Sequence, residues 1–181
     1  MIHDSRSQSP ASRYPPTVST ELRVIAIDDW EDFRAVRLKA LADSPDSFGV
    51  TLAEALEKPP SVWRDRAAGP DPIVLGFADH GSIAMGGLYL PDASADAFVW
   101  GMWVEPASRG NGVASRILER LLEHADAEGR SVVLHVTEGN DAARALYERH
   151  GFTHTGEVQP LREGSTVRIH TMRRGTIIRS G

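Results

Sequence analysis

The chain has 181 residues, of which 41% are hydrophobic and 25% are charged, and its formal net charge is −5. This composition is typical of one globular domain with its own core, and the acidic balance disfavours a protein whose main partner is nucleic acid, because phosphate neutralisation needs a basic excess. No stretch approaches the roughly 20 apolar residues that span a bilayer, and there is no cysteine, so we expect no membrane partner, no disulfide and a reducing, cytoplasmic location.

Residues 1–20 differ in composition from the rest of the chain. They are rich in Ser, Pro and Arg and lack the apolar centre of a signal peptide. Such a composition favours a disordered leader over residues 1–20, although Pro-rich segments also serve as docking arms for partners. We expect the folded domain over residues 21–175 and a short C-terminal tail over residues 176–181.

The first half of the domain begins with a strand, continues with helices and ends with a hairpin. Apolar residues recur at helical spacing after Asp28 and Asp29, which offer caps, and Pro45 breaks that helix. A His80–Gly81 turn separates two strand-like runs. The expected elements are a strand over Glu21–Ile27, a helix over Trp30–Ala42, weaker helices over Leu52–Glu57 and Ser61–Ala68, and strands over Pro72–Asp79 and Ser82–Leu90.

The second half alternates strands and helices. Gly129 and Gly151 follow its two helices, and Gly129 stands where a left-handed cap does. The expected elements are a strand over Ala97–Val104, a helix that follows a glycine turn and runs to about Glu128, a buried strand over Ser131–Val136, a helix over Asn140–His150 and a last strand over Thr166–Arg174. This order predicts an α/β fold in one domain, with a mixed central sheet flanked by helices.

Two glycines, Gly110 and Gly112, stand directly before the most regular helix. A glycine pair in this place is most often only a turn, but a helix N-terminus preceded by residues without Cβ atoms also lets a phosphate approach its free N–H groups. The stretch lacks the Lys-Ser/Thr pair of a nucleotide P-loop, and Ser115 stands where a dinucleotide fingerprint has its third glycine. A different pyrophosphate carrier is indicated. The helix itself carries an apolar stripe that we expect to pack on the sheet: Val113, Ile117, Leu118, Leu121, Leu122 and Ala125.

Two motifs in this half resemble a known family. Arg109–Ala114 (RGNGVA), which follows the strand end WVEP, resembles the pyrophosphate loop of the GCN5-related N-acetyltransferase (GNAT) family, Gln/Arg-x-x-Gly-x-Gly/Ala. Asn140–Phe152 (NDAARALYERHGF) is similar to the second signature of the family, and the two motifs stand in the family's order. The resemblance extends over Glu21–Arg174 and is firmest over Val99–Gly156. It implies a single-domain GNAT-like fold with a mixed, mostly antiparallel central sheet.

The resemblance also implies a reaction and a co-substrate. GNAT enzymes move an acetyl group from acetyl-CoA to a primary amine of a small molecule or peptide, by direct attack in a ternary complex and without a metal. A catalytically silent acyl-CoA-binding sensor or scaffold is the alternative, and a homodimer stays open. The backbone of Met102, Trp103 and Val104 would bind the pantetheine arm like an added strand. The other coenzyme-binding residues would be Arg109, Gly110, Asn111, Gly112, Val113, Ala114, Ser115, Asn140 and Tyr147.

Two residues are candidates for proton transfer. Tyr147 matches the tyrosine that the family uses as general acid for the departing thiolate, although an aromatic residue at helical spacing with Ala143 and Leu146 is also typical of a core. His135 lies where some relatives carry a glutamate base, and its imidazole titrates near neutral pH. A core histidine and a water chain are the alternatives to this base, and Glu105 is the next candidate.

The sequence leaves the acceptor open. In the family the acceptor site is shaped by the segments that correspond to Asp43–Ala68 and Gly156–Arg168, where the resemblance is weakest. We expect Trp100 and Trp103 to line this site on alternate faces of their strand, with core packing as the alternative. Four carboxylates could attract a cationic amine, although exposed acids on helices are ordinary: Asp43, Asp46, Glu54 and Glu57.

Overall fold

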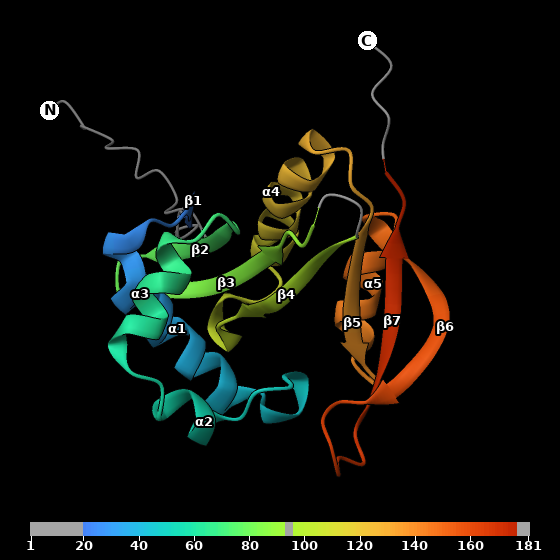
Figure 1. Ribbon diagram of the computed structural model, residues 1–181, viewed down its shortest axis with the longest axis horizontal. Coiled ribbons are helices and arrows are strands. Elements are labelled where there is room, and N and C mark those ends of the chain that lie inside the picture. The colour runs from blue at the N-terminus through green and yellow to red at the C-terminus, as the bar shows by residue number, and fades with distance from the viewer. Residues whose placement is uncertain (1–19, 93–95, 177–181) are drawn as a thin grey trace, which may run out of the picture.

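A seven-stranded sheet runs through the molecule in the order β1-β2-β3-β4-β5-β7-β6, and each neighbouring pair is antiparallel except β4 with β5 (Figure 1). The computed structural model describes residues 20–92 and 96–176, so the predicted leader and tail, apart from Thr20 and Thr176, lie outside the described residues. The mixed sheet that the order of elements predicts, and its mostly antiparallel pairing that the family resemblance implies, are confirmed. The strands are β1 Glu21–Val24, β2 Ile73–Ala78, β3 Gly81–Tyr89, β4 Ala97–Val104, β5 Val132–Thr137, β6 Thr153–Pro160 and β7 Arg168–Arg174.

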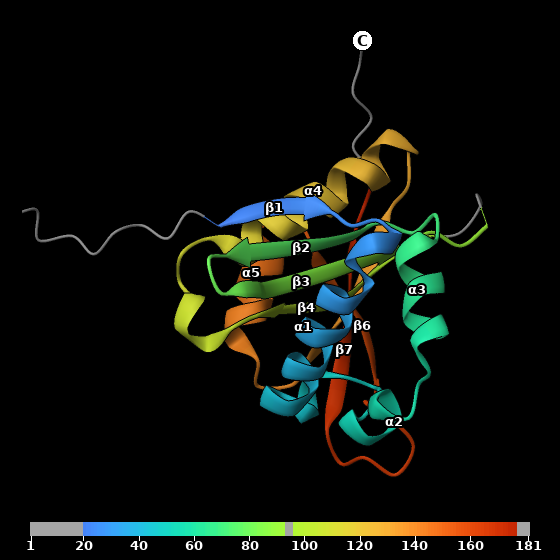
Figure 2. The same ribbon diagram turned by 90° about the vertical axis from the view of Figure 1, so that its left-hand side faces the viewer.

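Helices cover both faces of the sheet (Figures 1 and 2). α1, α2 and α3 lie on one face, and α4 and α5 lie on the other. Within the described ranges no helix has both the length and the apolarity that a membrane crossing needs. The helices are α1 Trp30–Asp43, α2 Leu52–Leu56, α3 Pro60–Ala68, α4 Val113–Ala127 and α5 Asp141–Arg149, with short 3-10 turns η1 Ile27–Asp29, η2 Pro45–Ser47 and η3 Pro106–Ser108.

The core consists of two apolar clusters, one on each face of the sheet. The predicted apolar stripe of α4 is fully buried in the first cluster. A buried leucine contributes about 1.5–3 kcal/mol, so side chains such as Leu118 and Leu121 hold α4 firmly on β2, β3 and β4. This packing fixes the position of the first turn of α4, which follows the glycine pair.

β4 and β5 diverge along their length. Their parallel pairing covers only Ala97–Val99 against Val132–Leu134, although β4 continues to Val104 and β5 to Thr137. Figure 1 shows the two strands separating toward their carboxyl ends. The last five residues of β4 therefore present an edge that no strand of the described residues pairs with on the β5 side.

A bulge in β4 changes which face its side chains occupy. Gly101 and Met102 together lie opposite Gly86 of β3, and Gly101 has a φ of +69°, which glycine adopts most readily. Because of this extra residue, Trp100 and Trp103 both pack against the cluster under α1 and α3. The expectation that they lie on alternate faces is wrong, since strict alternation fails at a bulge.

Two strand expectations need correction. β6 was not among the expected elements; it is an edge strand whose side chains are all exposed, so it lacks the apolar alternation that marks a half-buried strand. The first strand ends at Val24 instead of Ile27, because the Ala26 backbone N–H donates to Asp29 Oδ2 at 3.0 Å and the chain turns into η1.

Candidate active site

The carboxyl end of β4 leads directly into the glycine loop. Both Trp103 and Val104 are buried, whereas Met102 is half-buried and packs toward α4. An unpaired strand edge offers backbone N–H and C=O groups to an extended ligand. The three predicted pantetheine contacts therefore lie on the open edge of β4, where a strand-like ligand arm could be added.

The start of α4 has free backbone donors and no side-chain cap. Arg116 donates the first helical hydrogen bond to the Gly112 carbonyl at 3.1 Å, so the N–H groups of Val113 to Ser115 have no partner within the helix. Gly110 and Gly112 have φ values of +81° and +74°, and a Cβ atom on either would meet nothing within 4 Å. There is no acidic residue in the first turn. These features suit an anion at the positive end of the helix dipole.

Arg109 is engaged by the protein itself. Its Nη2 donates to Asp43 Oδ2 at 2.6 Å, and its Nε donates to the Val104 carbonyl at 2.9 Å. Trp103 Nε1 donates to the same carboxylate oxygen at 2.9 Å. The hydrogen bonds from Trp103 and Ser44, together with the Arg109 guanidinium, hold the pKa of Asp43 below its usual range. Asp43 is therefore a structural ligand of the loop, a role that its sequence position does not reveal.

Ser115 belongs to a polar cluster at the side of the loop. Its hydroxyl lies 3.0 Å from His150 Nε2 and donates to Glu119 Oε1 at 3.2 Å. His150 Nδ1 lies 2.8 Å from the Leu146 carbonyl, an acceptor only, so this nitrogen carries the proton. The cluster joins α4 to α5. These contacts occupy the Ser115 side chain, whereas the Ser115 backbone N–H stays without a helical partner at the start of α4.

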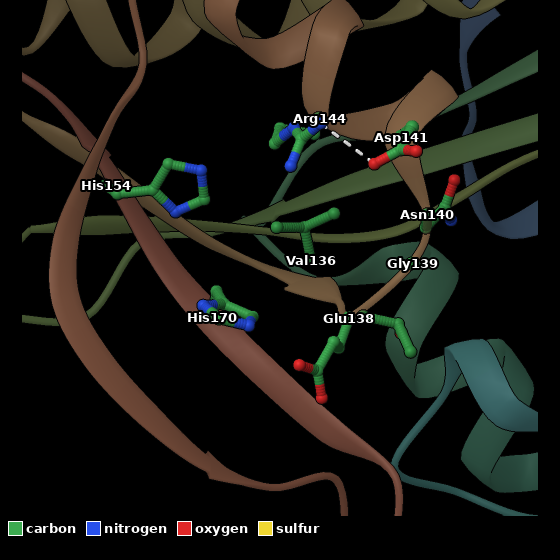
Figure 3. Close-up of a pocket in the computed structure, with 9 residues that line it drawn as sticks. Val136, Glu138, Gly139, Asn140, Asp141, Arg144, His154 and His170 are labelled. Atoms are coloured by element: carbon green, nitrogen blue, oxygen red, sulfur yellow. Dashed lines mark ion pairs between the residues drawn. The ribbon is translucent and has the colours of Figure 1, made fainter.

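Asn140 caps α5. Its side-chain oxygen accepts from the Ala143 N–H at 3.1 Å, which confirms the capping role. Asn140 also lines a pocket of about 200 Å³ at the carboxyl end of β5 (Figure 3). Figure 3 shows Arg144 and Asp141 paired at one side of this pocket and His154 and His170 at the other. Of the predicted coenzyme ligands, Asn140 alone lines this pocket.

Tyr147 lies in the apolar cluster beneath α4 and α5. Its ring contacts Phe152 edge to face at 6.0 Å, and it shares the cluster with Val113 at the start of α4. Burial raises the pKa of Tyr147 to about 12, so the phenol stays protonated at neutral pH and can donate a hydrogen bond. The core position and the proposed acid role are thus compatible.

His135 lies on the opposite face of the sheet from Tyr147. Its neighbours Leu134 and Val136 are buried against α4 and α5, while His135 points away from them. The imidazole contacts the Phe98 ring at 5.0 Å and has Nε2 3.5 Å from the amide nitrogen of Gln159. His135 is exposed rather than a core residue. The partial burial of its imidazole lowers the pKa of His135, and the Glu157 charge opposes this effect. His135 follows Leu134, the last residue of β5 that pairs with β4, at the point where the two strands separate.

The segments expected on the acceptor side lie together. Arg162, in the loop between β6 and β7, donates to the Phe48 carbonyl at 3.1 Å, and Thr137 Oγ1 donates to the Asp46 carbonyl at 3.3 Å. Of the four carboxylates, Asp43 binds the glycine loop and Glu54 completes a capping box with Thr51. These two therefore have structural partners already.

Comparisons with known proteins identify the family of the chain. A family model described as the acetyltransferase (GNAT) family matches residues 29–152. A mycothiol acetyltransferase of Beutenbergia cavernae is 30% identical over 122 residues, which cover 66% of this chain and 39% of that protein. The N-alpha-acetyltransferase RimI of Mycobacterium tuberculosis is 41% identical over 71 residues, which cover 39% of this chain and 44% of that protein. The matched part of the chain spans less than half the length of each relative.

A solved structure shares the fold. The ribosomal L7/L12 alpha-N-protein acetyltransferase RimL, in complex with coenzyme A, superposes with a TM-score of 0.69 over 90% of this chain and 97% of that chain. The two sequences are 19% identical over this match, so the likeness concerns the fold alone.

Proposed function

The chain belongs to the acetyltransferase (GNAT) family, whose model matches residues 29–152, and from this membership we propose that it transfers an acetyl group from acetyl-CoA to a primary amine of a small molecule or peptide. The observation that carries the proposal is the uncapped, glycine-flanked start of α4 beside the open edge of β4. Both sequence relatives are named acetyltransferases, and the structural neighbour holds coenzyme A. A cytoplasmic location stays a prediction from the sequence, and a homodimer stays open.

The residues of this site fit the two polar parts of acetyl-CoA. The N–H groups of Val113, Ala114 and Ser115 would bind the pyrophosphate, because they lack helical partners and the glycines before them leave room for its approach. The edge from Met102 to Val104 would hold the pantetheine arm by backbone hydrogen bonds. Arg109 would act here mainly by holding the loop in place through Asp43.

Acetyl-CoA supplies the acyl group as a thioester, and the chain supplies donors and a proton path. When the amine attacks, a C–N bond forms, the C–S bond breaks, and the amine loses a proton while the thiolate gains one. A thiol has a pKa of about 8.5, so a positioned donor stabilises the departing thiolate. Tyr147, protonated at neutral pH, would be that donor from the α5 side. A backbone N–H of β4 would polarise the carbonyl oxygen.

His135 would accept the amine proton on the other side of the sheet. It lies on the face away from Tyr147, so acid and base would act from opposite faces where β4 and β5 separate. Its lowered pKa keeps the imidazole neutral at physiological pH, which is the form that accepts a proton. A water between His135 and the amine would serve the same path.

Release of free thiol from acetyl-CoA in the presence of pooled amines tests this function. We expect acetyl-CoA to raise the melting temperature, because it binds the folded state, and we expect thiol release that depends on the amine. A melting shift without thiol release from any amine would favour a silent acyl-CoA-binding module. The absence of both would overturn the assignment of the site.

A further inference from the structure

Three buried side-chain nitrogens in the described residues lack an acceptor, and all three belong to the packing between α1, α3 and β4. They are Arg37 Nη1, Trp63 Nε1 and Trp100 Nε1. The Phe33 ring connects the two indoles, with its centroid 5.4 Å from that of Trp63 and 6.3 Å from that of Trp100. Most buried polar groups are hydrogen-bonded, so donors without a protein acceptor mark a place where a water or a ligand supplies one.

Arg37 is the charged member of this group. Its guanidinium carbon lies 4.6 Å from the Phe48 ring centroid and 5.8 Å from that of Trp100. Within the described ranges it has these ring contacts but neither an ion pair nor a hydrogen bond. Burial, followed by the Arg66 charge, lowers the pKa of Arg37 to about 10, so the side chain remains cationic at neutral pH.

A second arginine shares the same indole. The guanidinium carbon of Arg66, on α3, lies 4.5 Å from the Trp100 ring centroid, and Arg66 is exposed. Two positive charges thus adjoin one ring, and no carboxylate of the described residues pairs with either. Two acids of the α1–α3 region have other partners, since Asp43 binds the glycine loop and Glu54 caps α2. Like charges without a counterion are unfavourable until an anion joins them.

This pair of arginines lies on the acceptor side of the sheet. A Cβ atom placed on Gly101 would be 3.4 Å from Arg37 Nη1, so the guanidinium meets β4 at its bulge, immediately before the edge that would hold the pantetheine arm. The Phe48 carbonyl accepts from Arg162 of the β6–β7 loop. Arg37 therefore meets β4 at its bulge and stacks on Phe48, whose carbonyl contacts the β6–β7 loop, on the face of α1 and α3 that Figure 2 shows.

We propose that Arg37 and Arg66 form an anion subsite of the acceptor site, and that the acceptor amine carries a carboxylate, as a free amino acid does. This inference rests on the proposed function, because it requires an amine acceptor between α1, the bulge of β4 and the β6–β7 loop. A carboxylate supplies the acceptor that the Arg37 guanidinium lacks and neutralises both charges. The Phe48 and Trp100 rings restrict the guanidinium, so little side-chain entropy is lost when the anion binds.

The test compares L-amino acids with the matching L-amino-acid amides as acceptors, in wild type and in Arg37→Gln and Arg66→Gln. An amide also lowers the pKa of its own amine, so the informative quantity is the acid-to-amide ratio of kcat/KM relative to wild type. We expect Arg37→Gln to lower this ratio by about 10- to 100-fold, the value of a hydrogen bond between charged groups, and Arg66→Gln to lower it less because Arg66 is exposed.

Arg64→Gln is the matched control, because Arg64 also lies on α3 and stacks on an indole, that of Trp30, at 4.5 Å. Its acid-to-amide ratio should equal that of wild type. If Arg37→Gln lowers kcat/KM equally for the acid and for the amide, Arg37 only packs against the Phe48 and Trp100 rings and the subsite is overturned. Should Arg37→Gln not fold, the acid-to-amide ratio of Arg66→Gln decides between the subsite and simple packing in the same way.

A second measurement separates this inference from the proposed function. With coenzyme A present, an amino acid should raise the melting temperature of wild type more than its amide does, and Arg66→Gln should reduce that difference. An equal effect of acid and amide overturns the anion subsite even where acetyl transfer occurs. The absence of thiol release with every amine overturns the proposed function, whatever the melting difference shows.

Discussion

Arg109 and Asp43 join the glycine loop to the end of α1 through a 2.6 Å contact between Nη2 and Oδ2. The same carboxylate oxygen accepts from Trp103 at the end of β4, so one atom connects a helix of the acceptor side, the open strand edge and the loop that would bind pyrophosphate. The other hydrogen bonds of the loop are local, from Arg109 Nε to the Val104 carbonyl and from Asn111 Nδ2 to the Ser108 carbonyl. Asp43 is therefore the residue on which we expect the loop geometry to depend.

Asp43→Asn should weaken acetyl-CoA binding and lower stability. The amide keeps one acceptor oxygen but loses the charge that holds Arg109, and a loss of about 1 kcal/mol corresponds to a few degrees in Tm for a domain of this size. The KM for acetyl-CoA should rise while kcat changes little. Thermal melting and initial rates measure both effects, and an unchanged KM would show that the loop keeps its geometry without Asp43.

The same carboxylate predicts a pH dependence with a definite sign. The pKa of Asp43 is lowered in the folded state, first by the Trp103 hydrogen bond and also by Ser44 and Arg109. A carboxyl with a depressed pKa stabilises the fold above its unfolded pKa of about 3.9, and this contribution is lost as the pH falls through the lower folded value. The Tm difference between wild type and Asp43→Asn should therefore shrink below about pH 4.

Gly112→Ala should abolish or strongly reduce the rise in melting temperature that acetyl-CoA causes. A Cβ at this position meets no protein atom, so it stands in the space through which a phosphate would approach. The control is Gly129→Ala at the other end of α4, where φ is +66° and the Cβ position is also open. Both variants carry the strain of an alanine at positive φ. If acetyl-CoA raised the melting temperature of the two variants equally, the pyrophosphate site would be contradicted.

The local parts of this site follow from the sequence, and the long-range parts do not. The stripe along α4 and the cap at Asn140 depend on spacing within a few residues, so pattern alone predicts them. The pair of Asp43 and Arg109 joins residues 66 apart in the chain, and no local pattern marks either partner. Contacts of this kind require the tertiary fold.

β4 and β6 show two reasons why a strand pattern in the sequence can fail. The bulge at Gly101 brings Trp100 and Trp103 to one face, although alternation places them on opposite faces. β6 exposes every side chain, so its pairing with β7 comes from backbone hydrogen bonds that leave no hydrophobic signature. Arg37 is a further case, because its neighbours Phe48, Trp100 and Arg66 come from the segment after η2, from β4 and from α3.

Tyr147→Phe should lower kcat about 100-fold and leave acetyl-CoA binding nearly intact, because it removes the proton donor and keeps the ring in the core. A wild-type kcat in this variant would leave Tyr147 as a core aromatic only. Stability offers a second measurement, since burial raises the pKa of Tyr147 to about 12. The contribution of the neutral phenol is complete below its unfolded pKa of about 10 and is lost between about pH 10 and 12. The melting temperature of Tyr147→Phe should therefore fall less steeply with rising pH over that range than the melting temperature of wild type does.

His135→Gln should remove the rising limb of the pH profile of kcat/KM. Only neutral imidazole accepts the amine proton, and burial lowers the pKa of His135, so this limb should have its midpoint below the ordinary histidine value of about 6.5. The groups that face the ring are Phe98, Gln159 and the charge of Glu157. Glutamine keeps the approximate size and some hydrogen bonding but does not titrate.

Glu157→Gln supplies the decisive comparison for this base. The Glu157 charge raises the pKa of His135 against the effect of burial, so its removal should move the rising limb to lower pH and leave the plateau rate unchanged. An amine substrate titrates in solution and does not respond to Glu157. A limb that persists in His135→Gln and stays in place in Glu157→Gln belongs to the amine, and in that case His135 is not the base and the proton passes to water.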